Sequence, residues 1–379
     1  MEYDNINISN VEDIIAQTVK EKIENIMKLE QHQYLEENPG IKNGYYKRNL
    51  KTKYGEIKQL SVPSNMDNSF HSAILDENKS IGLEELITSM YSNGVSTRRI
   101  SEILKDISNN RYSPSSVSRI TELTLEEVNK FVNRKLDNRY TAVMLDGLFF
   151  YLRRETVDKE PVIFALGIKE SGEYEILGFY LTIKESHNNY KDVLEDLYRR
   201  GLRESLLFIA DGITDLDEEV MKIYTGSDFQ LCTIHYARGL KSKVKEKDME
   251  IIEDAERMFK CNSKQEAIVR FNEMKNKWEN KYPNVIYNTE RKLGQLLRFY
   301  DYPSKIRNSL KSTNEIEMLN GEIRRRVKVI SSFPDEDFAM KMFYLKSIEF
   351  NSRHAFRKVN GYIKCNDEIG EMFNRRYPL

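Results

Sequence analysis

The spacing of hydrophobic residues divides the chain into a helical part and a part that mixes strands with helices. Between residues 81 and 131, apolar side chains recur at the i, i+3, i+4, i+7 spacing of amphipathic helices, as in "STRRISEILKDI". A further helix is predicted at "SPSSVSRITELTLEEVNKFV", with Ser113 as the N-cap and Pro114 in the first helical position. Three short helices with tight turns are typical of a helix-turn-helix module, and a plain helical bundle is the alternative.

After Arg139 the hydrophobic pattern changes to that of β-strands. Three apolar, β-branched or aromatic runs follow one another: "YTAVMLDGLFFYLRR", "PVIFALGIKE" and "YEILGFYLTIK". The next segments read as helix "NYKDVLEDLYRRGL", strand "SLLFIADG", helix "DLDEEVMKIY" and strand "DFQLCTIH". Three consecutive strands followed by alternating helices and strands predict an α/β domain with a mixed sheet.

The remaining segments complete a division of the chain into five regions. A helix is predicted at residues 11–34, "KNGYYKRNLKTKYGEIKQLSVP" reads as two short strands or a loop, and residues 64–80 read as a linker. Residues 238–296 are charged and helical, and two last helices are predicted at "STNEIEMLNGEIRRR" and "FPDEDFAMKMFYLKSIEFNSRHAF". We therefore expect a basic N-terminal region (1–80), a helical module (81–137), the first part of the α/β domain (138–237), a helical insertion (238–304), and the last part of that domain with C-terminal helices (305–379).

Composition places the protein among intracellular globular proteins. The chain has 379 residues, of which 40% are hydrophobic. No apolar run reaches the roughly 20 residues that span a bilayer, and the polar N-terminus does not resemble a signal peptide. Three widely spaced cysteines do not form a disulfide framework and fit a reducing compartment. We expect a cytoplasmic protein without membrane contact.

Basic residues are concentrated in short segments although the net charge is only −1. One such segment, at residues 41–60, includes Lys47 and Arg48. Local basic patches in a neutral protein are consistent with contact to nucleic acid, and a solvated surface is the alternative. The second patch and the basic side chains of the helix-turn-helix candidate would contact DNA on the same reasoning: Arg324, Arg325 and Arg326, and Arg98, Arg99 and Arg119.

Two aspartates stand at the ends of apolar strands. Asp146 follows "AVML" and Asp211 follows "LLFIA", and each precedes a glycine. Asp-Gly is a favoured turn pair, so each site alone could be a hairpin. Carboxylates at the ends of neighbouring strands can also hold two divalent ions roughly 4 Å apart for phosphoryl transfer, and hard oxygen ligands favour Mg²⁺. A third acidic residue would be needed on a neighbouring element.

Two of the three glutamates in "STNEIEMLNGEIRRR" have structural explanations. Ser312 and Glu315 have the S-x-x-E spacing of a capping box, which predicts that Glu315 turns back to the start of the helix. Glu322 precedes Arg325 and Arg326 by three and four residues, which predicts an ion pair on the helix surface.

Glu317 has neither explanation. It lies at the edge of the apolar stripe of the predicted helix, in a stripe of its own with Asn320, Gly321 and Arg324. A polar stripe beside the buried face is suited to point a carboxylate into a site. We therefore predict Glu317 as the third metal ligand.

Cys232 and His235 have the C-x-x-H spacing of a zinc half-site. A structural zinc site takes four ligands, and the sequence has no second pair at such spacing, only the distant Cys261. Zinc is therefore not expected. Trp278, the one tryptophan, lies in the charged helical stretch, and its simplest role is that of a buried core anchor.

The motifs together resemble the Mutator-type family of prokaryotic insertion-sequence transposases. The matching segments are "NGYYKRNLKTKYGEIKQLSVP", "YSNGVSTRRISEIL", "SSVSRIT", "LDG" at Asp146, "EILGFYLTIKES", "YRRGL", "ADG" at Asp211, "QLCTIHYAR" and "STNEIEMLNGEIRRR". Their order and spacing extend over about 300 residues. The sequence departs from the family pattern at Tyr190, Asp215 and Gly239.

The resemblance implies an RNase H-like catalytic domain, interrupted by the helical insertion, with Asp146, Asp211 and Glu317 as its DDE triad. It implies two Mg²⁺ ions, for which Mn²⁺ can substitute. It implies double-stranded DNA as partner, both terminal inverted repeats and target, and a dimer or larger assembly associated with the nucleoid. Cys232 and His235 would brace the sheet after the second aspartate, and Trp278 would stack on a DNA base near the cut.

Three functions remain open from the sequence. The first is Mg²⁺-dependent strand cleavage at insertion-sequence ends followed by strand transfer. The second is DNA binding by a catalytically decayed or co-opted transposase. The third is an RNase H-like nuclease that cuts without joining.

Overall fold

The computed structural model describes residues 42–52, 55–66, 125–182, 187–213, 215–330 and 332–378, with a few isolated positions before residue 102. The chain divides into two compact units, residues 1–128 with 337–345 and residues 129–336 with 346–379. The predicted helix-turn-helix module and its Arg98, Arg99 and Arg119 lie outside the described residues.

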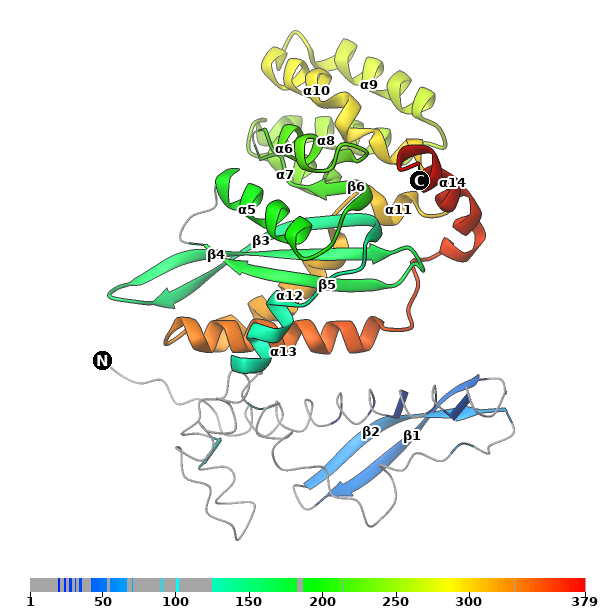
Figure 1. Cartoon of the computed structure of the whole chain (residues 1–379). Helices are drawn as coiled ribbons and strands as arrows, with labels where there is room; N and C mark the ends of the chain where they lie inside the picture. Colours follow the sequence, from blue (N-terminus) through cyan, green and yellow to red (C-terminus); the bar gives the residue numbers. More distant parts are fainter. Residues whose placement is uncertain are drawn as a thin grey trace. The chain divides into compact units, whose positions relative to one another are not determined.

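A five-stranded mixed sheet forms the centre of the second unit (Figure 1). The strand order is β5-β4-β3-β6-β7. Strand β4 pairs antiparallel with β3 and with β5, whereas β6 is parallel to β3 and β7 is parallel to β6. The bounds are β3 Arg139–Arg153, β4 Val157–Lys169, β5 Tyr174–Leu181, β6 Glu204–Ala210 and β7 Asp228–Leu231. The predicted α/β class and mixed sheet are confirmed.

The sheet is buried on both faces in its central strands. Residues 205–210 of β6 are all buried, as are most residues of β3 up to Leu148. Runs that are apolar without alternation are expected for strands covered on both sides. In Figure 1, helix α5 (His187–Arg199) lies over one face of the sheet and α12 (Asn314–Ile330) over the other.

The parallel pairing of β3 with β6 fixes the level of the two aspartates. Asp211 directly follows β6, as predicted, but Asp146 lies inside β3 as the register partner of Phe164 on β4, so it is neither at a strand end nor in a hairpin. Met144 is the register partner of Ile209. Asp146 and Asp211 each follow two residues later, so they stand at the same level of neighbouring strands. The carboxyl ends of parallel strands meet at one edge of the sheet, which is where ligands bind in open α/β sheets.

The segment after β7 differs from the prediction. A strand was expected through His235, yet β7 ends at Leu231 and helix α7 (Thr233–Lys241) begins two residues later. The run "LCTIH" is apolar enough for a strand, but the parallel ladder to β6 ends where Ala210 ends. The change turns Cys232 into a helix N-cap and puts His235 on the first turn of a helix.

Helices fill the chain between β7 and α12, as predicted. After α7 they are α8 (Glu250–Met258), α9 (Lys264–Trp278), α10 (Pro283–Leu296) and α11 (Arg307–Leu310), with short 3₁₀ turns at Glu246–Asp248 and Arg298–Asp301. One further helix, α6 (Leu216–Ile223), connects β6 to β7. The start of α9 is capped by Ser263, which accepts a hydrogen bond from the Glu266 N–H at 3.1 Å. The Glu266 carboxylate accepts in return from the Asn262 N–H at 3.0 Å.

The C-terminal segment adds a helix that was not predicted. After α13 (Glu336–His354), a 3₁₀ turn (Tyr362–Cys365) leads into α14 (Asn366–Arg376). Arg376 fastens α14 to the sheet, because it donates to the Leu206 carbonyl at 2.8 Å and to the Asp228 carboxylate at 2.6 Å.

In the first unit, the basic N-terminal segment forms a two-stranded antiparallel hairpin of β1 (Lys42–Thr52) and β2 (Gly55–Asn65). The strand alternative for this segment is confirmed. Lys47 and Arg48 are exposed on β1, beside the exposed side chains of Tyr45 and Tyr46.

Helix α12 is joined to α13 by an ion pair that replaces the predicted one. Glu322 accepts two hydrogen bonds from Arg353, at 2.9 and 2.7 Å, instead of pairing with Arg325 along its own helix; the side chain of Arg326 lies outside the described residues. Burial opposes ionisation of Glu322, but the Arg353 hydrogen bonds and charge outweigh it and hold the pKa of Glu322 below its usual value. The tertiary partner wins because a bidentate guanidinium contact is stronger than an exposed pair on one helix.

We expect Arg353→Gln to lower the free energy of unfolding by about 1 kcal/mol at pH 7. Because the pKa of Glu322 is lowered in the folded state, the pair stabilises above the unfolded-state pKa of about 4.3 and is lost as the pH falls further. Urea unfolding of both proteins between pH 3 and 7 measures the difference. Arg270→Gln, which removes the exposed Arg270–Glu273 pair, is the control and should change stability by less than about 0.5 kcal/mol. A difference that grows toward acid pH would contradict this account.

Candidate active site

The site is built around Asp146, a buried carboxylate. Asp146 is only 4% exposed, and its Oδ2 accepts a hydrogen bond of 2.7 Å from the Asn320 side chain on α12. Burial raises the pKa of Asp146 to about 7, the charge of His235 opposes this rise, and the charge of Glu317 adds to it. A carboxyl group in that state has too few hydrogen-bonding partners for its charge and would gain from a cation placed beside it.

Asp211 stands at the same sheet edge but is exposed. Its Oδ1 accepts from the Gly212 N–H at 2.6 Å, and its main-chain carbonyl accepts from the Ile213 N–H at 2.8 Å. The Asp-Gly pair therefore does make a tight local turn, as the alternative for this motif predicts. The turn leaves the carboxylate at the end of β6 open to solvent.

Glu317 points toward Asp146 from the first turn of α12. Its two oxygens each accept a hydrogen bond of 2.8 Å from Arg238 on α7. The first turn of α12 is defined by the Glu317 N–H, which donates to the Thr313 carbonyl at 3.0 Å. The structure thus brings Glu317 and Asp146 to either side of His235, with Asp211 at the level of Asp146 on the neighbouring strand.

His235 lies between the two nearest carboxylates. Its Nε2 is 3.7 Å from Asp146 Oδ1 and 3.4 Å from Glu317 Oε1. The pKa of His235 is raised to about 9, first by the adjoining Cys232 side chain and then by the charges of Asp146 and Asp211. The raised pKa favours the protonated imidazole, whose charge attracts both carboxylates.

Cys232 and the residue after it join the two acid-bearing segments. The Cys232 N–H donates to the Ala210 carbonyl at 2.8 Å, next to Asp211, and the Thr233 N–H donates to the Lys311 carbonyl at 3.0 Å, just before α12. The buried Cys232 thiol lies 3.4 Å from the Thr313 hydroxyl. These contacts are those of a brace after the second aspartate, the role that the resemblance implies for Cys232.

Glu315 differs from its prediction in detail. Helix α12 begins at Asn314, which makes Thr313 the N-cap and moves Glu315 from the third helical position to the second. The Glu315 Oε2 atom is buried and has no hydrogen-bond partner among the described residues. The capping box fails because the helix starts one residue later than the S-x-x-E spacing requires. The charge of Glu315 acts on Tyr174 and His354, so Glu315 faces away from Asp146.

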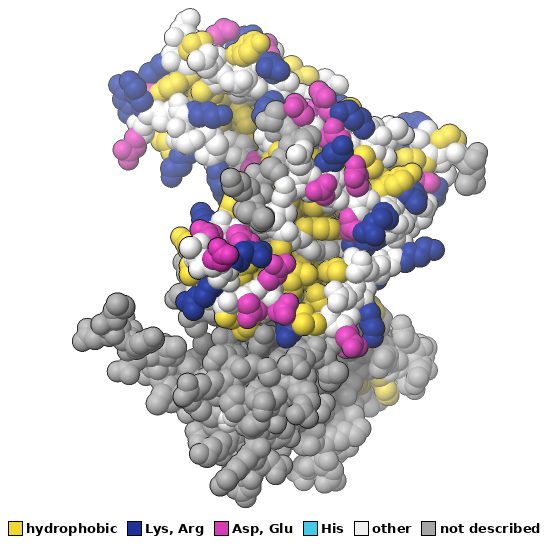
Figure 2. All heavy atoms as spheres, turned by 60° about the vertical axis from the view of Figure 1, so that its left-hand side comes forward, with side chains coloured by type: hydrophobic (Ala, Val, Ile, Leu, Met, Phe, Trp, Pro, Cys, Tyr) yellow, Lys and Arg dark blue, Asp and Glu magenta, His cyan; other side chains and the backbone are white. Residues whose placement is uncertain are grey.

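The predicted DNA-contacting residues lie in different places. Arg324 and Arg325 are exposed on α12, and the charge of Arg324 acts on Asp146. The side chain of Arg326 lies outside the described residues. On the face shown in Figure 2, Lys and Arg are interspersed with Asp and Glu.

Trp278 is packed inside the helical region. It is 7% exposed, and its Nε1 donates to Asp254 on α8 at 2.8 Å. Stacking on a base would require the ring to leave this contact. The core-anchor alternative describes the observed position.

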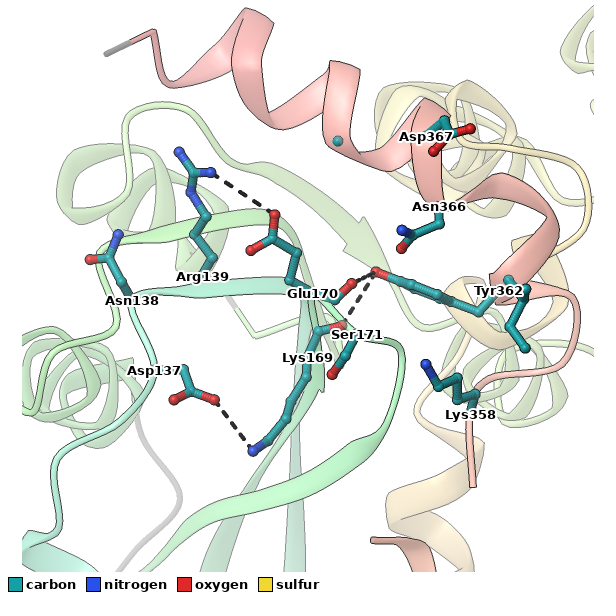
Figure 3. A pocket seen from close by; sticks show the side chains of 12 residues that line it. Asp137, Asn138, Arg139, Lys169, Glu170, Ser171, Lys358, Tyr362, Asn366 and Asp367 are labelled. Atoms are coloured by element: carbon teal, nitrogen blue, oxygen red, sulfur yellow. Dashed lines mark hydrogen bonds and ion pairs between the residues drawn. The ribbon is translucent and has the colours of Figure 1, made fainter. Parts of the chain in front are cut away.

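A cavity of about 810 Å³ opens at the start of β3 (Figure 3). Its charged groups pair with one another: Lys169 with Asp137 at 3.3 Å and Arg139 with Glu170 at 3.9 Å. The Tyr362 hydroxyl donates to the Glu170 carbonyl at 3.0 Å. Its charges are balanced and its lining does not include Asp146, which lies seven residues further along β3 than Arg139, so this cavity is not part of the carboxylate site.

The oxygen donors of these side chains are of the type that binds a hard divalent cation, but the side chains do not converge on one point in this structure. Within the described part of the chain, no three His, Cys, Asp or Glu side chains converge closely enough to form a metal site. Glu317 is turned to Arg238 and Asp211 to its own turn. The buried Asp146 carboxylate, which has too few hydrogen-bond donors for its charge, nevertheless favours a cation. Oxygen donors on three elements suit Mg²⁺.

Comparison with known proteins decides the family. Residues 2–355 match the family described as Transposase, Mutator family. The chain belongs to this Mutator family of transposases. The resemblance found in the sequence motifs is thus confirmed.

Curated members of the family extend over nearly the whole chain. The transposase for insertion sequence element IS905 of Lactococcus lactis is 33% identical, with 88% of this chain and 85% of that protein covered. The transposase for IS1201 of Lactobacillus helveticus is 31% identical, with 87% and 92% covered. The transposase for IS256 in transposon Tn4001 of Staphylococcus aureus is 28% identical, with 89% and 88% covered.

A solved structure, the Drosophila P element transposase strand transfer complex, has a TM-score of 0.35 and 10% identity, covering 75% of this chain and 95% of that one. This structural similarity is too low to identify the fold, which is described by its strand order. No described helix of this Mutator-family chain is long and apolar enough to cross a membrane.

Sequence reasoning missed Arg238 and the contacts of Asn320 and His235. Asn320 was placed in the stripe of Glu317, and its contact with Asp146 could have been anticipated from that spacing. Arg238 follows His235 by three residues, so it shares one face of α7 with it. That signal was hidden because the start of α7 was read as a strand.

We expect Asn320→Ala to lower the free energy of unfolding by about 1–3 kcal/mol at pH 8, because the buried Asp146 carboxylate loses its hydrogen-bond donor. Asn314→Ala changes an exposed residue in the first turn of the same helix and should cost less than about 0.5 kcal/mol. Chemical denaturation of the two variants and the wild type tests this. Equal losses for both variants would mean that Asn320 does not support the buried carboxylate.

Proposed function

We propose that this protein is a DDE transposase that cleaves DNA strands at the ends of an insertion sequence and joins the freed ends to target DNA. The observation that carries the proposal is the position of three acidic side chains: Asp146 just past the end of the β3–β6 pairing, Asp211 at the same level just after β6, and Glu317 in the first turn of α12, with His235 between it and Asp146. Membership of the Mutator family of transposases supports it.

The strand order supports the RNase H-like fold that this function requires. Three consecutive strands pair antiparallel, and the next two run parallel to the central one after helical connections. On this proposal, the α8–α10 helices are an insertion between the second and third acidic residues of the catalytic domain.

Asp146, Asp211 and Glu317 would hold two Mg²⁺ ions, with Mn²⁺ able to substitute. The ions would supply a more acidic attacking oxygen and neutralise charge on the phosphate and leaving oxygen. The residues of the chain do the rest. Asn320 and the Asp146 backbone position on β3 fix the first carboxylate, while Arg238 sets the orientation of Glu317. Release of Glu317 from Arg238 would free its oxygens for the site.

The cations around the carboxylates have a role in binding the substrate. Charge develops on the non-bridging phosphate oxygens during in-line displacement, and fixed cations stabilise it. Arg324 lies within electrostatic reach of Asp146 and Arg238 lies at Glu317. On this proposal both guanidinium groups contact DNA phosphates. Double-stranded DNA is the partner, and bringing two ends together calls for a dimer or a larger assembly.

Incubation of the protein with labelled DNA ends from the flanks of its gene, a target plasmid and Mg²⁺ tests the function. We expect cleaved ends and joined product, both abolished by chelation of the metal. Cleavage without joining would indicate a nuclease. Binding without cleavage would indicate a DNA-binding protein that has lost catalysis.

The same assay tests the assignment of the three acidic residues. Asp146→Asn, Asp211→Asn and Glu317→Gln should each lower the cleavage rate about 100-fold or more, because each removes a carboxylate that holds the metal ions. Glu315→Gln and Glu322→Gln, on the same helix as Glu317, are the matched controls and should stay within a few-fold of the wild type. An active Glu317→Gln with an inactive Glu315→Gln would overturn the assignment.

A further inference from the structure

A second cavity, of about 480 Å³, lies between α7 and α8. Its floor is apolar and comes from α7, α8 and the residues flanking α8: Ile234, Ala237, Met249, Ile252 and Phe259. This volume is that of an ordinary small-ligand pocket. Unlike the larger cavity in Figure 3, it adjoins the site that contains Glu317.

Helix α7 forms a wall shared by the cavity and the carboxylate site. His235 and Arg238, three residues apart, face Glu317. Ile234, Ala237 and Lys241 lie on the neighbouring stripe at i, i+3 and i+7 and line the cavity. Arg238 lines the cavity as well. A ligand in the cavity is therefore one helix width from the proposed reaction centre.

The rim of the cavity is cationic. It includes Arg238, Lys241, Lys260 and Lys311, against the single carboxylate of Glu256. Glu256 pairs with Lys260 at 2.9 Å. Lys311 is half-buried and donates to the neutral Asn308 amide at 2.9 Å. Burial, followed by the charge of Lys260, lowers the pKa of Lys311. An anion would relieve this crowding of positive charge.

An apolar floor with a cationic rim matches the two parts of a nucleotide. A base places its flat face against apolar side chains, and the phosphate that follows meets lysine or arginine. A duplex cannot enter a cavity of this size, whereas a single extruded nucleotide can. The Figure 3 cavity lacks this complementarity because its charges are paired.

We propose that the cavity between α7 and α8 binds one unpaired nucleotide of the DNA end, with its base on Ala237, Ile252 and Phe259 and its phosphate at Lys311 and Lys241. The inference rests on the proposed function, since it takes DNA as the substrate. It gives the helices after β7 a role in holding the strand beside the carboxylates, a role that the buried Trp278 does not perform in this arrangement.

The test uses the full chain in EDTA and two versions of the same labelled end, one fully paired and one with three unpaired nucleotides at the cut. We expect the wild type to bind the unpaired end about tenfold more tightly, as stacking of one base implies. 2-Aminopurine at the unpaired positions should change its fluorescence on binding. Excess deoxynucleoside monophosphate should not displace the DNA, which would separate a DNA end from a free nucleotide as the ligand.

Three variants test whether the cavity residues cause the preference for the unpaired DNA end. Ala237→Phe, which fills the cavity, and Lys311→Gln, which removes a rim cation, should each reduce the tenfold preference to about twofold or less. Lys243→Gln changes an exposed lysine just beyond α7, outside the cavity lining, and should keep the preference. Circular dichroism melts would check that each variant is folded, and Lys241→Gln provides a second rim variant on the surface.

Equal affinity of the wild type for the two ends would overturn the inference, as would full preference in both Ala237→Phe and Lys311→Gln. Displacement of the DNA by free nucleotide would overturn it too. Parallel reactions with Mg²⁺ distinguish failure of the cavity inference from failure of the proposed transposase function. Cleavage and joining without the preference would remove only the cavity's role, whereas the preference without cleavage would remove only the catalytic proposal.

Discussion

The burial of the Asp146 carboxylate is the constraint around which the site is arranged. A carboxylate that is 4% exposed must find hydrogen bonds or positive charge, or it takes up a proton. Here it receives one hydrogen bond from Asn320 and the partial support of the His235 imidazolium. These two partners connect α12 and α7 to the middle of β3. Glu317 is positioned by α12, which contacts Asp146 through Asn320, and Asp211 by β6, which pairs with β3.

Two main-chain contacts keep the arrangement in register. The Cys232 N–H extends the β6–β7 pairing to the residue before Asp211, and the Thr233 N–H reaches the segment that leads into α12. Both contacts come from the two residues where a strand becomes a helix. The same helix then presents His235 and Arg238 to the carboxylates on one side and an apolar, cationic cavity on the other. Catalysis and strand binding would thus share one wall.

Local patterns were sufficient to predict the sheet, the helices after it and the position of Asp211 after its strand, because hydrophobic period depends on adjacent residues. Asp146 was expected at a strand end as well, but β3 continues through it to Arg153, because the pairing with β4 extends further than the pairing with β6. The choice of Glu317 also followed from helix periodicity, since Asn320 in the same stripe contacts Asp146. What failed depended on partners far along the chain. Glu322 pairs with Arg353, thirty-one residues away, rather than with Arg325 on its own helix. Arg238 meets Glu317 across 79 residues, and the start of α7 could not be recognised in an apolar run.

The central claim is that Asp146, Asp211 and Glu317 together hold divalent cations. The most direct measurement is a crystal structure of the protein with Mn²⁺ and a DNA end, in which anomalous scattering locates the metal. The account predicts manganese between these three carboxylates, with Glu317 turned from Arg238 toward the metal and a DNA phosphate alongside. Manganese bound elsewhere, with Glu317 still paired to Arg238 in the DNA complex, would contradict it.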